Sequence, residues 1–220
     1  LKMTRIYFVE SVRYLNQFKM KYSQNNEEQI IKDYFKGYTG TFVDIGANDG
    51  ITLSNTRALI ESGWSGIMIE PSPTAFNKLK NSISTYPNVF CYQYAIVPKR
   101  SPKEMILNDS TSLLNQNDTS LVSTLVPEEM ERFKSVVQYT PVKVKTFTWA
   151  TARNRWKYKT FDLLSLDIEG MDLQVLEEID LTGFKMVIVE WNGKNKERFV
   201  ELCAGFNLIH ENGENLIFAK

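Results

Sequence analysis

From residue 41 onward, short runs of apolar residues alternate with segments whose apolar residues recur every three or four positions. The short runs are typical of buried strands, and the longer period is typical of helices that cover one face of a sheet. The predicted strands are 41–45, 66–70, 88–96, 161–168, 186–190, 207–210 and 216–219. The predicted helices between them are about 51–62, 72–85, 172–179 and 195–204.

This order of elements predicts an α/β fold, with a doubly wound, mostly parallel, seven-stranded, Rossmann-like sheet. The last two predicted strands flank Glu211-Asn212-Gly213-Glu214, a turn-forming stretch that joins them in a hairpin. A hairpin at the end makes the last strand antiparallel to the others. A plain parallel dinucleotide-binding fold does not predict that ending.

The chain divides into an N-terminal helical arm, residues 1–36, and one domain, residues 37–220. Helices are predicted in the arm over 6–20 and 27–35. Within the domain, residues 98–141 lack a clear hydrophobic period, and a long irregular tract is usually functional or disordered. We therefore expect 98–141 to supply a lid and part of the substrate site. After it, 142–145 alternates like a strand and 148–155 reads as a helix.

The charge and composition of the sequence indicate which classes of partner the protein binds. Lysine and arginine balance aspartate and glutamate, 26 against 26, so the basic surplus that drives binding to nucleic-acid phosphates is absent. The sequence lacks the ~20-residue apolar run of a membrane span and begins without the apolar core of a signal peptide. Cys91 and Cys203 have no partner at metal-ligand spacing and are expected to be free thiols. These features predict a cytoplasmic protein that binds neither nucleic acid nor membrane; they leave its oligomeric state open.

The stretch Asp44–Gly50, between the first strand and the following segment, is the central candidate for chemistry. Gly46 and Gly50 permit a tight turn and close approach of a ligand to the backbone. Asn48 stands where a nicotinamide-binding loop needs its second glycine. Asp44 would repel a pyrophosphate, whereas the ammonium and sulfonium groups of S-adenosylmethionine are cationic. The loop therefore favours S-adenosylmethionine as cofactor.

Glu70 ends the second strand, 24 residues after Gly46. A carboxylate there can accept hydrogen bonds from both ribose hydroxyls, which serves NAD and S-adenosylmethionine equally well. Further predicted cofactor contacts are Ala47, Pro71 and Ser72, which adjoin these two sites, and Ala95 near the end of the third strand.

Asp167 and Glu169 lie at the end of the fourth strand, which is expected to adjoin the first strand where ligands bind in open α/β sheets. Either residue could be the general base for a hydroxyl nucleophile or a ligand to a divalent cation; alternatively, Asp167 only orients the cofactor and Glu169 caps a helix. They are the predicted catalytic pair, and no metal is predicted. Glu190, at the end of the fifth strand, is a weaker candidate, and His210 is expected to be a bystander.

These motifs resemble those of the FkbM-type methyltransferases, whose fold is the class I methyltransferase sheet. The matching segments are Phe42–Gly50, Ile69–Pro71, Leu166–Gly170 and Val175–Leu176, with Ser23-Gln24, Glu27-Glu28 and Ser54-Asn55-Thr56 resembling a common subgroup. The resemblance covers about residues 23–97 and 142–190. The sequence departs from the family in two places. The family often has another acidic pattern at the position of Asp172, and residues 98–141 resemble nothing placed in the family.

The resemblance implies methyl transfer from S-adenosylmethionine to a hydroxyl oxygen, often on a sugar, glycan or small metabolite. It also implies that Asp44, Gly46, Asn48 and Glu70 contact the cofactor. Two other functions stay open: a catalytically silent module that binds an adenosyl group or a partner, and an NAD-dependent oxidoreductase. The silent module would be favoured if Asp167 and Glu169 faced away from the cleft.

Overall fold

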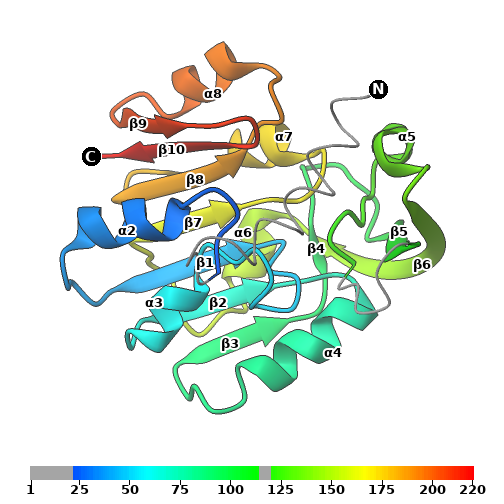
Figure 1. Ribbon diagram of the computed structural model, residues 1–220, viewed down its shortest axis with the longest axis horizontal. Coiled ribbons are helices and arrows are strands. Elements are labelled where there is room, and N and C mark those ends of the chain that lie inside the picture. Colours follow the sequence, from blue (N-terminus) through cyan, green and yellow to red (C-terminus); the bar gives the residue numbers. More distant parts are fainter. Residues whose placement is uncertain (1–21, 114–119) are drawn as a thin grey trace.

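The computed structural model describes residues 22–113 and 120–220, so the helix predicted over 6–20 lies outside the described residues. A seven-stranded sheet has the order β3-β2-β1-β7-β8-β10-β9 (Figure 1). Its strands are β1 Thr41–Ile45, β2 Ser65–Ile69, β3 Val89–Tyr92, β7 Leu163–Leu166, β8 Met186–Glu190, β9 Asn207–Glu211 and β10 Asn215–Ala219. Strand β10 runs antiparallel to both of its neighbours, and the pairs from β3 to β8 are parallel. The predicted sheet, including its hairpin ending, is confirmed.

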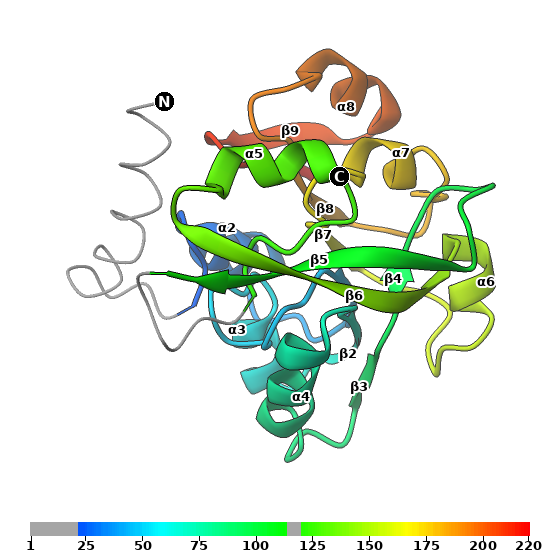
Figure 2. The same ribbon diagram turned by 90° about the vertical axis from the view of Figure 1, so that its right-hand side faces the viewer.

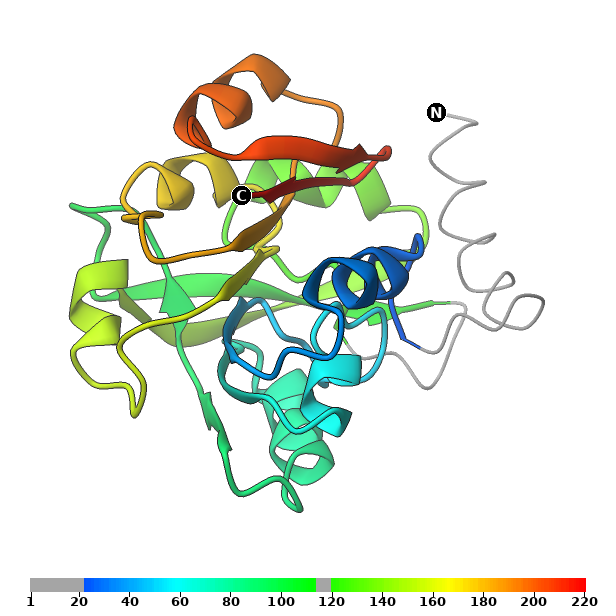
Figure 3. The same cartoon turned by 90° about the vertical axis from the view of Figure 1, so that its left-hand side faces the viewer.

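Helices cover both faces of this sheet. They are α2 Glu27–Phe35, α3 Arg57–Glu61, α4 Pro73–Ser82, α6 Trp149–Arg153, α7 Asp172–Leu176 and α8 Lys196–Leu202. One buried cluster contains residues of α2, α3 and α4, and the other contains residues of α6, α7 and α8. Figure 3 shows α2, α3 and α4 together on one side of the strands. The sheet is therefore doubly wound, as predicted.

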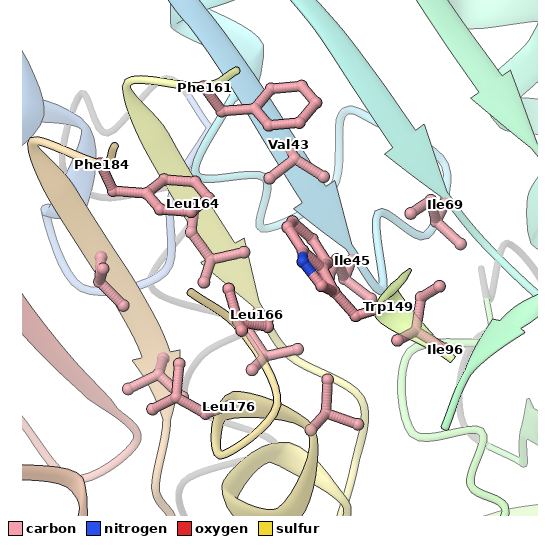
Figure 4. Packing of buried hydrophobic residues seen from close by; sticks show 14 of the residues in the cluster. Val43, Ile45, Ile69, Ile96, Trp149, Phe161, Leu164, Leu166, Leu176 and Phe184 are labelled. Carbon is pink, nitrogen blue, oxygen red and sulfur yellow. The ribbon is translucent and has the colours of Figure 1, made fainter. Parts of the chain in front are cut away.

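Alternate residues of the central strands serve the two clusters. Phe42 packs in the cluster with α2, whereas Val43 and Ile45 pack in the other. Figure 4 shows Ile45 of β1 and Leu166 of β7 near Trp149 of α6. Strands buried on both faces read as continuous apolar runs, which is why this part of the sheet was predictable.

The helix predicted over 51–62 is wrong in its first half, since α3 begins only at Arg57. The carboxylate of Asp49 accepts hydrogen bonds from the backbone N–H groups of Ile51 and Thr52 at 2.8 and 2.7 Å, and Leu53 has a φ of 56°. A side chain that captures backbone donors in this way competes with helix formation. Residues 51–56 therefore form a loop beside the glycine turn.

The strand predicted over 88–96 is two strands. After β3 the chain leaves the main sheet, and β4 (Ala95–Ile96) pairs with β6 (Val137–Phe147) in a second sheet. The helix predicted near 72–85 and the strand near 161–168 are present but shorter than predicted.

The prediction that 98–141 is irregular is also wrong. Strand β5 (Glu104–Ser112) pairs antiparallel with β6 along its whole length, and η1 (Pro127–Glu129) and α5 (Met130–Phe133) lie between them in the chain. The buried face of β5 carries Asp109 as well as Leu107, so no apolar alternation marks it. Figure 2 shows β5, β6 and α5 in front of the main sheet, on the side to which β1, β2, β7 and β8 point in Figure 1.

Two other features bear on the sequence predictions. Among the described helices, none has the length and apolar character needed to cross a membrane. Cys91 and Cys203 are both free thiols, as predicted.

Candidate active site

A cavity of about 580 Å³ opens at the carboxyl ends of β1, β2, β7 and β8. Strand β1 lies between β2 and β7. The chain adds β2 and β3 on one side of β1 and later adds β7 and β8 on the other side, so the cavity lies at the topological switch point of the sheet. Ligands of open α/β sheets bind at such a point, and the volume is that of a typical small-molecule site. The predicted site residues that line it are Asp44, Gly46, Ala47, Asn48, Glu70, Pro71, Ala95, Asp167 and Glu169.

The turn that begins at Gly46 is fixed between β2 and β7. The backbone N–H groups of Gly46 and Ala47 both donate to the carbonyl of Ile69, at 2.9 and 3.0 Å. Gly46 has a φ of 88°, and a Cβ at this position would lie 1.6 Å from the carbonyl oxygen of Asp167. Only glycine fits this turn, which brings the ends of β1 and β7 into direct contact.

Asp44 is buried beneath the turn. Its Oδ2 accepts a hydrogen bond of 2.6 Å from the hydroxyl of Thr56, which precedes α3. Burial raises the pKa of Asp44 to about 6, although hydrogen bonds from Thr56 and Ser165 oppose this change. The side chain thus helps to hold the loop and also faces the cavity.

Glu70 is held by two backbone donors. Its Oε2 accepts from the N–H of Asn48 at 2.9 Å, and its Oε1 accepts from the N–H of Ser72 at 2.7 Å. Burial raises the pKa of Glu70 to about 7 against the effect of these hydrogen bonds. Each carboxylate oxygen has a second lone pair. Glu70 can therefore still accept hydrogen bonds from a ligand's hydroxyl groups.

Gly50 and Ser72 are the predicted cofactor contacts that do not line the cavity. A Cβ on Gly50 would meet Leu79 of α4 at 2.7 Å, so this glycine allows the loop to pack on the helix. The hydroxyl of Ser72 accepts from the N–H of Ala75 at 3.1 Å and caps α4. The structure gives both residues a role in placing the loops.

Replacing Ser72 by alanine should therefore lower the free energy of unfolding by about 1 kcal/mol, the usual value of a helix N-cap. Chemical denaturation measures this loss. The affinity for S-adenosylhomocysteine should stay within a few-fold of wild type, because the side chain is fully buried away from the cavity. A large loss of affinity with unchanged stability would instead make Ser72 a ligand contact.

Carboxylates gather at the ends of β7 and β8. Asp167, Glu169 and Glu190 each offer an oxygen atom, and these three atoms lie within 4.8 Å of one another. Asp172 accepts hydrogen bonds from the backbone N–H groups of Ile168 and Gly170, at 2.9 and 3.2 Å, and so fixes the loop that carries two of them. The sequence predicted Asp167 and Glu169 at this rim and named Glu190 as the weaker candidate; the structure brings all three together.

The pKa values of the carboxyl groups in this acidic cluster are raised. Burial, followed by the charges of Asp172 and Asp44, raises the pKa of Asp167 to about 8. Burial and the charge of Asp167 raise the pKa of Glu169 and of Glu190 well above the ordinary value. Perturbed carboxyl groups in one cavity are typical of catalytic and ligand-binding sites.

Sequence reasoning missed several lining residues from distant parts of the chain. Arg132 comes from α5, and its Nη1 lies 3.0 Å from Glu129 and 3.9 Å from Glu169. Glu214 comes from the final hairpin turn, where Gln24 and Asn25 each donate to its carboxylate at 2.7 Å. The resemblance of the segment around Gln24 to a family subgroup was the available signal. His210 lies on β9 and does not line the cavity.

The comparison with solved structures returns methyltransferases of low sequence identity. A methyltransferase FkbM from Methylobacillus flagellatus KT is 12% identical with a TM-score of 0.48, covering 83% of this chain and 44% of its own. Monomeric WbdD is 11% identical with a TM-score of 0.48, and the match covers 94% of this chain and 47% of the WbdD chain. A putative caffeoyl-CoA O-methyltransferase from Staphylococcus aureus is 12% identical with a TM-score of 0.49, and the match covers 98% of this chain and 91% of the other chain. The chain spans less than half of the length of the first two.

The comparison with curated proteins gives no match. The model of the methyltransferase FkbM domain matches residues 44–214. This match begins at Asp44 on β1 and ends at Glu214 in the last hairpin, so it includes nearly all of the strand ends that form the cavity. Because the family model covers most of the sequence, the chain belongs to the FkbM methyltransferase domain family.

Proposed function

We propose that the chain is an S-adenosylmethionine-dependent methyltransferase that methylates a hydroxyl oxygen on a sugar, a glycan or a small metabolite. The observation that carries the proposal is the cavity in which the Gly46 turn, Glu70 and Asp167 meet. In the proposed complex, Glu70 accepts hydrogen bonds from the ribose. The Gly46 turn passes beneath the cofactor, and Asp167 lies beside the transferable methyl group.

The charge of the cavity supports this cofactor. Its acidic lining residues are Asp44, Glu70, Asp167, Glu169, Glu190 and Glu214, and its basic residue among the described residues is Arg132. Such a lining favours the ammonium and sulfonium cations of S-adenosylmethionine and disfavours the pyrophosphate of NAD. It also disfavours a nucleic-acid acceptor, whose phosphates would face the same charges.

The reaction needs a place for one proton. The acceptor oxygen attacks the methyl carbon, the bond from that carbon to sulfur breaks, and its electron pair stays on sulfur to give S-adenosylhomocysteine. The hydroxyl proton goes to a carboxylate oxygen of Asp167, with Glu169 in support. Burial raises the pKa of Asp167 to about 8, so its ionised form is a stronger base than an ordinary aspartate, and that form accepts the proton.

The catalytically silent alternative depended on carboxylates that face away from the cleft. Asp167 and Glu169 instead line the cavity. The β5–β6 pair and its connection supply Leu107, Ser123 and Leu125 to the same lining, which supports the proposal that this segment forms part of the acceptor site.

A thermal-shift comparison of S-adenosylmethionine, S-adenosylhomocysteine, NAD and NADP tests the cofactor. A ligand present at 100-fold its dissociation constant stabilises a protein by ~2.7 kcal/mol. Both adenosyl compounds should raise the melting temperature, and both nicotinamide compounds should leave it unchanged. Stabilisation by NAD alone would point to the oxidoreductase.

The affinity for S-adenosylhomocysteine should depend on pH through Glu70. Its ionised form is the better acceptor for ribose hydroxyls, and its pKa is about 7 in the free protein. Affinity should therefore fall as the pH drops below about 7, approaching tenfold per pH unit, and level off above it. The charges of Asp109 and Asp44 also raise the pKa of Glu70, so the wild-type profile depends on these neighbours as well as on Glu70.

Replacing Glu70 by glutamine isolates its share of the pH dependence. E70Q should bind more weakly at pH 8 and show a flatter profile between pH 5 and 8, measured by calorimetry. Parallel profiles for the two proteins would remove Glu70 from the ribose site.

A further inference from the structure

We propose that Asp167, Glu169 and Glu190 bind one hard divalent cation at the carboxyl ends of β7 and β8. The cation would be bound within the proposed methyl-transfer site. Its binding does not depend on whether the chain transfers a methyl group. Only the role of the cation in activating the acceptor rests on the proposed function.

The geometry of the three carboxylates suits such an ion. One oxygen from each lies within 4.8 Å of the others. Around an octahedral ion with bonds of ~2.1 Å, oxygen atoms are about 3 Å apart at adjacent positions and about 4.2 Å apart at opposite positions. Small side-chain movements therefore bring the three oxygens to binding distance. The ion would keep coordination positions open for water or for an acceptor hydroxyl.

Glu190 gives a second, independent indication of a ligand. Its side chain lines the cavity and the residue is only 8% exposed, yet its Oε2 has no hydrogen-bond partner among the described residues. Leaving a buried acceptor unpaired is costly, and a charged one more so. A cation bound by the Glu190 carboxylate would compensate for this missing partner.

The protein's own cations do not neutralise the cluster. Among the described residues, Arg132 is the one basic residue that lines the cavity. Its Nη1 lies 3.9 Å from Glu169. The same nitrogen lies closer to Glu129, at 3.0 Å, and Lys194 also pairs with Glu129 at 3.1 Å. Three carboxyl groups therefore share one distant guanidinium, and a small cation would supply the positive charge that the cluster lacks.

A bound cation would act directly on the acceptor. A hydroxyl oxygen coordinated to it would have a lowered pKa, as metal-bound water does. Each carboxylate needs only one oxygen to bind the ion, so the second oxygen of Asp167 remains to receive the hydroxyl proton.

Binding of Mn²⁺ to the metal-free chain of residues 1–220, followed by electron paramagnetic resonance without any cofactor, tests the site. Wild type should bind one Mn²⁺ per chain, and Mg²⁺ should compete. E190Q and D167N should each weaken Mn²⁺ binding at least tenfold. E201Q removes a carboxylate from the exposed surface of α8 and should bind like wild type.

Folding and cofactor binding are measured on the same samples. E190Q should fold, because it removes a buried charge from an acidic cluster, and its circular dichroism should match wild type. Absence of stoichiometric Mn²⁺ binding, or equal binding by wild type and folded E190Q, would overturn the metal site. Binding of S-adenosylhomocysteine in the presence of EDTA reports separately on the proposed function, so the failure of one proposal is distinguishable from failure of the other.

Discussion

Replacing Asp167 by asparagine should lower methyl transfer by about 10²–10⁴-fold, the usual contribution of a positioned general base. An alcohol is a poor nucleophile until its proton can leave. Asp167 can take this proton because it lines the cavity just after β7, next to the backbone of the Gly46 turn. Asparagine keeps the shape of the side chain but cannot accept the proton. Asparagine is also a weaker cation ligand than a carboxylate, so weaker binding of the proposed cation would lower the rate as well.

The assay first needs an acceptor. Transfer of a radiolabelled methyl group from S-adenosylmethionine to a panel of sugars and hydroxylated small molecules identifies one. Asp33, on the exposed surface of α2, offers a matched control, and D33N should retain wild-type turnover. The affinity of D167N for S-adenosylhomocysteine should stay within a few-fold of wild type. A large loss of that affinity would mark Asp167 as a cofactor-orienting residue and contradict its catalytic role.

Replacing Glu70 by alanine should raise the dissociation constant of S-adenosylhomocysteine by about 10²–10⁴-fold. Two charge-assisted hydrogen bonds to the ribose are lost, at ~1.5–3 kcal/mol each. The structure adds a second cause in the same direction, because Glu70 also holds the backbone N–H groups of Asn48 and Ser72. Without these bonds the glycine turn is less well fixed.

Calorimetry at pH 8, where Glu70 is ionised, measures this effect. E201A, on the exposed surface of α8, controls for loss of a glutamate and should bind like wild type. An unchanged affinity in E70A would remove Glu70 from the cofactor site.

The central strands were predictable because their signal is local. Strands β1 and β8 have the predicted bounds, since each is a run of residues buried on both faces of the sheet. The loop after Gly50 was not predictable from apolar period, because the Asp49 carboxylate captures the donors that would start a helix. Strand β5 was missed because its buried face is lined in part by polar residues.

The same distinction holds for the candidate site. Asp44, Glu70 and Asp167 were found because each lies at or next to the end of a recognisable strand, and parallel strands bring their carboxyl ends to one edge. Arg132 and Glu214 reach the cavity only through the packing of α5 and of the last hairpin over that edge. No local pattern in the sequence marks residues that tertiary structure alone brings to a site.

A crystal structure of the chain with S-adenosylhomocysteine would show directly whether the cavity is the cofactor site. We expect the ligand in the cavity, with both ribose hydroxyls on the carboxylate of Glu70, its backbone contacts along the turn from Gly46 to Asn48, and its sulfur facing Asp167. A ligand bound elsewhere on the chain, or a ribose turned away from Glu70, would contradict the account.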